Sequence, residues 1–70
     1  MKPEVLKAIK EAAEALAHET EDRQDAMQYL DQLVDDTNAD FKLGYEKSSD
    51  SYGVLYKACH SAVWEATKGR

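Results

Sequence analysis

Apolar side chains recur at three- and four-residue steps through three stretches of the chain, which is the spacing of one face of a helix. The first stretch follows Pro3, which suits the first turn of a helix because its missing N–H needs no partner there. Alanines raise the helix propensity of this stretch. Its apolar face comprises Val5, Leu6, Ile9, Ala12, Ala13, Leu16 and Ala17. The pattern predicts a helix over residues 3–19.

The second stretch opens with a residue suited to begin a helix. Thr20 offers a capping hydroxyl, and Glu21 and Asp22 place negative charge in the first turn. The apolar stripe that follows contains Ala26, Met27, Leu30, Leu33, Val34 and Phe41. We therefore expect one continuous helix over residues 20–45, ending near Gly44.

The third stretch follows a polar segment, residues 46–51. Its composition predicts a loop that contains several residues able to cap the next helix. Apolar positions then resume at helical spacing as far as Gly69. They comprise Leu55, Ala58, Cys59, Ala62, Val63 and Ala66. The pattern predicts a helix over residues 50–68.

Three amphipathic helices with short connections predict an all-α fold, a small antiparallel three-helix bundle forming a single domain over residues 1–70. One alternative remains open. Apolar positions from Leu6 to Phe41 keep an unbroken heptad phase, which would suit one long helix in a coiled-coil dimer. Thr20 and Arg23 fall on that seam and weaken it, so the bundle is favoured.

The size and the cysteine count restrict the class of protein. A chain of 70 residues forms one domain, and its core is small. Cys59 is the only cysteine, so no disulfide can form within one chain. A single thiol fits a reducing compartment, and no secretory signal or membrane-spanning apolar run is evident. We expect a cytoplasmic protein.

The negative charge is concentrated in the middle of the chain. Between Thr20 and Leu43, seven acidic residues face only Arg23 and Lys42, and this segment carries the whole formal charge of −5. Direct binding to DNA or RNA needs clustered lysine and arginine, and anionic membranes also attract basic segments. The charge therefore argues against both, and favours a partner protein with a basic surface.

Tyr29 is the candidate anchor of an acidic docking face. On one continuous helix, Tyr29 would point away from the apolar stripe, surrounded by Asp22, Asp25, Asp36 and Asp40. Aromatic residues dominate interface energetics, and charges steer the encounter. Regularly spaced carboxylates can also imitate phosphates for a protein with a basic groove. The alternative is a solvated helix face with one incidental tyrosine.

A second patch lies near the end of the chain. Tyr56, His60 and Trp64 are spaced to form one row on the third predicted helix. Tryptophan is enriched at interfaces, so this row is a candidate dimer or partner patch. The alternative is that Trp64 covers the margin of a small core.

Neither a metal site, a cofactor site nor a catalytic centre is expected. Cys59, His60 and the distant His18 do not make a zinc site, and adjacent helical residues point about 100° apart, so Cys59 and His60 cannot form a catalytic pair. Residues 36–40 match the opening of a calcium loop, but Phe41 stands where glycine is required. No glycine-rich phosphate loop is present.

Two functions remain. The first is a non-enzymatic protein-binding module that docks through its acidic face, with inhibition of a nucleic-acid-binding protein by phosphate mimicry as one form. The second is a homodimeric structural or assembly subunit with apolar contacts around Trp64 and Tyr56.

Overall fold

The computed structural model describes residues 1–69, in which all the regular structure is helical. The four helices are α1 (Pro3–Glu19), α2 (Arg23–Met27), α3 (Leu30–Asp40) and α4 (Asp50–Ala66). The expectation of an all-α protein is therefore confirmed for these residues. The number of helices differs from the expected three.

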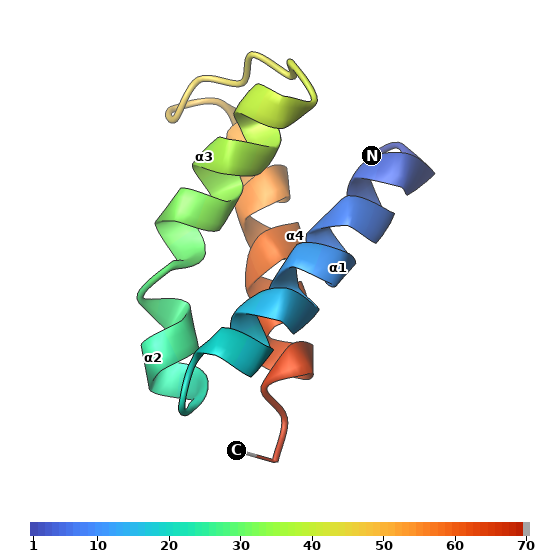
Figure 1. Cartoon of the computed structure of the whole chain (residues 1–70). Coiled ribbons are helices and arrows are strands. Elements are labelled where there is room, and N and C mark those ends of the chain that lie inside the picture. Colours follow the sequence, from blue (N-terminus) through green and yellow to red (C-terminus); the bar gives the residue numbers. More distant parts are fainter. Residues whose placement is uncertain (70) are drawn as a thin grey trace.

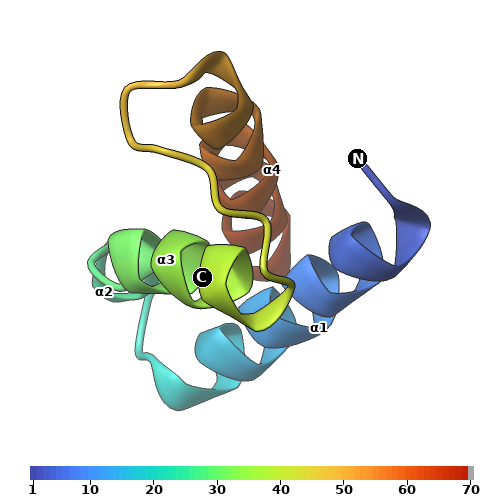
Figure 2. The same ribbon diagram turned by 90° about the horizontal axis from the view of Figure 1, so that it is seen from above.

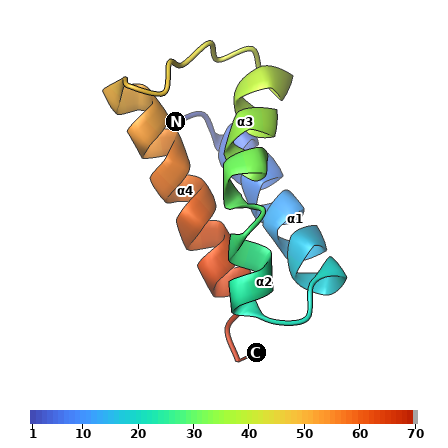
Figure 3. The ribbon, with the colours of Figure 1, turned by 90° about the vertical axis from the view of Figure 1, so that its left-hand side faces the viewer.

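The helices enclose a common interior. α1 and α4 run in the same general direction and cross, whereas α3 runs the opposite way beside α4 (Figures 1 and 3). Viewed from above, α1, α3 and α4 surround the centre of the molecule (Figure 2). α1 packs most extensively on α4, and α2 also reaches α4. The chain returns from α3 to α4 through the loop over residues 41–49.

The expectation of one continuous helix over residues 20–45 is wrong. α2 ends in a tight turn, where the N–H of Gln28 donates to the carbonyl of Asp25 at 3.2 Å and that of Tyr29 to Ala26 at 3.1 Å. Bonds to the third preceding residue narrow the last turn of a helix. Tyr29 adopts φ −97° and ψ 4° before α3 begins. Neither glycine nor proline stands at this break, so the usual breaker signals are missing from the sequence.

The long-helix alternative is also wrong, because α1 and α2 are separate. Thr20 is extended, and its hydroxyl donates back to the carbonyl of Leu16 at 2.8 Å. Asp22 caps α2 instead, accepting the N–H of Asp25 at 2.8 Å. An extended residue between two helices prevents a single helix over residues 6–41.

α3 ends earlier than expected, in a turn closed by Asn38. Lys42 takes a left-handed conformation with φ 52°, and the N–H of Leu43 donates to the carbonyl of Asn38 at 3.0 Å. This is the Schellman pattern that commonly ends helices. The Asn38 amide also pairs with both backbone groups of Tyr45, at 2.9 and 3.0 Å. Asn38 therefore fastens the loop to α3.

α4 begins at a serine cap and ends at a buried threonine. The Ser49 hydroxyl accepts the N–H of Tyr52 at 3.1 Å and donates to the carbonyl of Glu46 at 2.7 Å. The helix ends at Ala66 rather than at residue 68. The fully buried Thr67 hydroxyl donates to the carbonyl of Val63 at 2.7 Å, which satisfies one of the carbonyls left free at a helix end.

The core takes apolar residues from every helix. Alanine at two of these positions lets the helices approach closely. Burial of apolar surface contributes about 25 cal/mol per Å², so these side chains supply most of the drive to fold. They are Val5, Ile9, Ala13, Ala26, Leu30, Val34, Leu55, Cys59 and Val63.

Candidate functional site

The break between α2 and α3 divides the expected acidic face into two parts. Asp22 and Asp25 lie at the start of α2, where they border a shallow depression with neighbouring polar side chains. Tyr29 and Asp36 lie beside α1, in a groove between α1 and α3. Asp22 and Asp25 therefore border a different depression from the groove that Tyr29 and Asp36 line.

Asp22 and Asp25 have a structural task. The Asp22 carboxylate caps α2, and the Asp25 carboxylate accepts the N–H of Glu21 at 3.3 Å. The bond from the Asp25 N–H to Asp22 is half of a capping box and satisfies a backbone donor that the helix itself leaves free, while the Asp25 carboxylate binds the residue before the N-cap. Both charges also lie near the positive end of the helix dipole, which stabilises them. These two carboxylates are thus engaged in forming the helix start.

The groove between α1 and α3 has an apolar floor and acidic margins. α1 contributes a row at helical spacing, Ala12, Ala15, Leu16 and Glu19. α3 and its N-cap contribute the facing row, Tyr29, Gln32, Leu33 and Asp36. Tyr29 remains 46% exposed within it. The groove therefore brings an exposed aromatic ring, apolar side chains and two carboxylates together.

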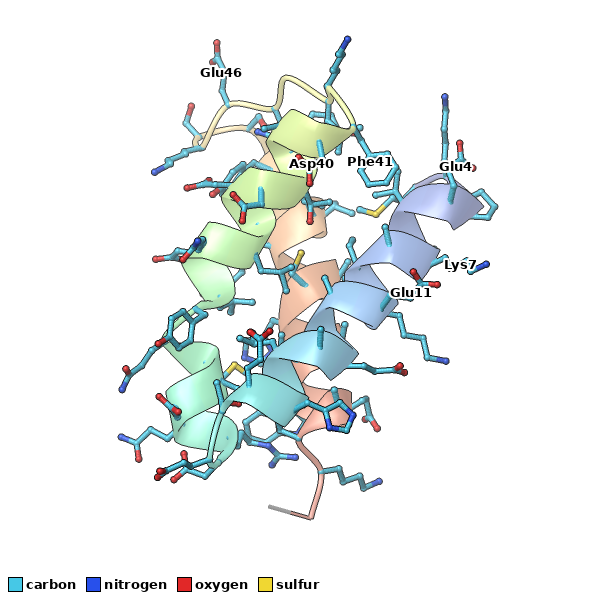
Figure 4. The ribbon with its side chains drawn as sticks, in the orientation of Figure 1. Glu4, Lys7, Glu11, Asp40, Phe41 and Glu46 are labelled. Carbon is cyan, nitrogen blue, oxygen red and sulfur yellow. The ribbon has the colours of Figure 1, made fainter. Side chains whose placement is uncertain are left out.

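Asp40 extends the acidic margin along α3. It lies one helical turn beyond Asp36 and is exposed. Figure 4 shows the Asp40 side chain on the side of α3 that faces α1, next to Phe41. Asp31 and Asp35 are exposed on α3 as well, outside the groove. All four carboxylates of α3 therefore meet solvent.

Arg23 does not neutralise this surface. It is the only cation between Glu21 and Phe41, and its guanidinium is turned onto the end of α4. There it donates to the carbonyl of Trp64 at 2.9 Å and to the Thr67 hydroxyl at 3.2 Å. Within α3 itself, Leu30–Asp40, the four aspartates are the only charged side chains. The sequence pattern did not predict this contact between Arg23 and the end of α4.

The Tyr56, His60 and Trp64 row lies on α4, and all three side chains are exposed. The rings of His60 and Trp64 stack at 5.9 Å between centres, with 11° between their planes. Arg23 lies 3.6 Å from the centre of the Trp64 ring, a cation–π contact. Trp64 nevertheless stays 46% exposed. The ring thus covers the end of α4 and also keeps a free apolar surface.

Tyr52 links α4 to α3 on the side away from the groove. Its hydroxyl donates to the Asp35 carboxylate at 2.8 Å. That hydrogen bond, together with desolvation and the negative charge of Asp35, raises the pKa of Tyr52 to about 12. The contact holds the first turn of α4 against α3, although neither residue was singled out in the sequence.

Cys59 is a core residue. Its side chain is fully buried, whereas His60 is exposed on the next position of α4. Burial raises the pKa of the Cys59 thiol to about 11, and a hydrogen bond with Thr37 opposes the rise. A thiol held in its protonated form is a weak nucleophile. Within residues 1–69, no group of three or more His, Cys, Asp and Glu side chains has the arrangement of a metal site.

Comparison with family models, with curated proteins and with solved structures finds no match for this chain. In the part of the chain that the structure describes, no helix has the length and apolar character needed to cross a membrane.

Proposed function

We propose that the chain is a non-enzymatic protein-binding module that docks onto a basic surface of another protein through α3. The observation that carries this proposal is the set of exposed carboxylates on α3. Asp31, Asp35, Asp36 and Asp40 are the only charged side chains of that helix, and the guanidinium of Arg23, on the preceding helix, is held at the end of α4. Surfaces of one sign attract partners of the opposite sign and accelerate their association.

Asp36, Asp40 and Tyr29 are the central docking residues. All three are exposed, and Asp36 and Asp40 are one helical turn apart. Asp22 and Asp25 add charge at the far end of the surface while also capping α2. Carboxylates repeated along a helix resemble a row of phosphates, so the partner we favour is a nucleic-acid-binding protein that this chain inhibits by mimicry.

A pull-down tests the docking surface. Tagged chain is incubated with nuclease-treated lysate of the source cell at low and high salt, beside two charge-matched variants. Asp36→Lys with Asp40→Lys alters α3, whereas Glu11→Lys with Glu65→Lys changes the net charge equally on α1 and α4. We expect one basic protein to be retained by the wild type and the control, and lost with the α3 variant and with salt.

Equal retention of that protein by the α3 variant would show that α3 is not the docking surface. Mimicry is then tested on the captured protein with an oligonucleotide as competitor. If the protein binds the oligonucleotide and the chain at the same time, it is not inhibited by mimicry.

The alternative proposal is a homodimer that forms through α1 and α4. The observation that favours it is the exposure of large apolar side chains there: Leu6 is 47% exposed, Val54 57% and Trp64 46%. A dimer would make stability depend on concentration. Sedimentation equilibrium tests this, and a folded monomer at nanomolar concentration would exclude an obligate dimer.

A further inference from the structure

We propose that the groove between α1 and α3 is the seat of a basic amphipathic helix of the partner protein. This inference rests on the proposed docking function and adds where the partner binds and in what conformation. The groove is the place where the acidic surface of α3 meets exposed apolar side chains.

The length of the groove matches two turns of a helix. Its α1 side runs from Ala12 to Glu19 and its α3 side from Tyr29 to Asp36, seven residues of separation on each. At 1.5 Å per residue, each side is about 10 Å long, close to two helical turns. Alanines on the α1 side leave room for incoming side chains, and the Tyr29 ring stands at one end as an apolar anchor.

The charge of the groove selects a cationic occupant. Glu19 and Asp36 line it, and no lysine, arginine or histidine does. A nucleic acid or an anionic membrane would meet repulsion there, and so would a second copy of this chain with its formal charge of −5. Lysine or arginine flanking an apolar stripe would pair with the margins while the stripe covers Leu16 and Leu33.

The backbone chemistry selects a helix rather than an extended segment. An extended peptide gains affinity by adding to the free edge of a sheet, and residues 1–69 contain no sheet. The walls of the groove are helices whose backbone groups bond internally. A partner helix also satisfies its own backbone, so it needs only apolar contact and charge pairing from this site.

Two synthetic peptides test the inference against the full chain by heteronuclear NMR titration. The first, of about 14 residues or four turns, carries leucine at i, i+3, i+4 and i+7 and lysine elsewhere. The second has the same composition scrambled so that no single apolar face forms. We expect the first to shift signals at residues 12–19 and 29–36, and to bind about tenfold more tightly, a difference of about 1.4 kcal/mol.

Three variants separate the groove from charge in general. Asp36→Lys reverses a charge in the groove, Ala15→Gln fills the floor without a charge, and Asp31→Lys makes the same charge reversal on α3 outside the groove. We expect the first two to weaken binding of the amphipathic peptide by about tenfold and the third to change it by less than about threefold, as a distant exposed charge does.

Four results would contradict the inference. Equal weakening by Asp36→Lys and Asp31→Lys, with no effect of Ala15→Gln, would mean that charge alone binds the peptide. Binding in the groove would then be excluded, while docking through the acidic surface would not. Equal affinity for the scrambled peptide would show that the groove does not require an amphipathic helix. Signal shifts confined to residues outside 12–19 and 29–36 would show that the peptide binds elsewhere on the chain. If neither peptide binds at low salt, the groove is not a site for a basic helix. The pull-down would still test the docking function separately.

Discussion

The guanidinium carbon of Arg23 lies 3.6 Å from the centre of the Trp64 ring, although 41 residues separate them in the chain. The same guanidinium donates hydrogen bonds to the carbonyl of Trp64 and to the hydroxyl of Thr67. One side chain thus ties the first turn of α2 to the end of α4. It also gives a structural role to a cation that falls on the heptad seam of the sequence.

Arg23→Gln should destabilise the protein by about 1–3 kcal/mol, because it removes a cation–π contact and two hydrogen bonds. Urea unfolding followed by the fluorescence of Trp64, the only tryptophan, measures this. Lys57→Gln, which removes one positive charge from an exposed position of α4, is the control and should be close to neutral. Equal effects of the two variants would assign the Arg23 contribution to net charge.

Replacing Asp22 separates its capping role from its charge. Asp22→Ala removes the acceptor for the Asp25 N–H and should cost about 1 kcal/mol of stability. Asp22→Asn keeps an acceptor and should cost only a few tenths, although it removes the same charge. Chemical denaturation measures both. Equal losses would show that the charge near the helix dipole, rather than the cap, stabilises α2.

Lys42→Gly should stabilise the protein by about 0.5–1 kcal/mol. Lys42 has φ 52°, a left-handed conformation that strains residues with a Cβ and suits glycine. Thermal unfolding should show a higher midpoint. Lys47→Gly is the matched control, since Lys47 loses the same charge in the same loop but is outside the left-handed region; it should be neutral or slightly destabilising. A gain in stability with both variants would show that the loss of a positive charge, and not the relief of backbone strain, stabilises the protein.

The Tyr52 hydroxyl should make stability fall at alkaline pH. Its pKa rises from 10.0 to about 12 in the folded chain, so the folded state holds the proton more tightly than the unfolded state does. The contribution is therefore complete below pH 10 and is lost as pH rises through about 12. Near-ultraviolet titration of tyrosinate should show one of the four tyrosines ionising last, and Tyr52→Phe should remove that step. If Tyr52→Phe leaves the titration curve unchanged in shape, the Asp35 hydrogen bond does not form.

The sequence by itself determined the fold class and, nearly, the bounds of the first and last helices. α1 lies where the periodicity placed it, and α4 differs by two residues at its end. Both helices have long apolar stripes, and burying such a stripe outweighs local preferences. Composition also established the acidic segment, because charge is a property of the residues and not of their arrangement.

Only the tertiary structure decided how the middle of the chain is divided. The stripe from Ala26 to Phe41 has one phase, yet the chain turns at Gln28 and Tyr29 so that α2 can reach α4 while α3 packs alongside. That turn leaves Asp22 and Asp25 at the start of α2, whereas Tyr29 and Asp36 line the groove with α1. The position of Arg23 on Trp64 was equally beyond prediction, because a contact between distant residues depends on how helices pack, which periodicity along one helix does not encode.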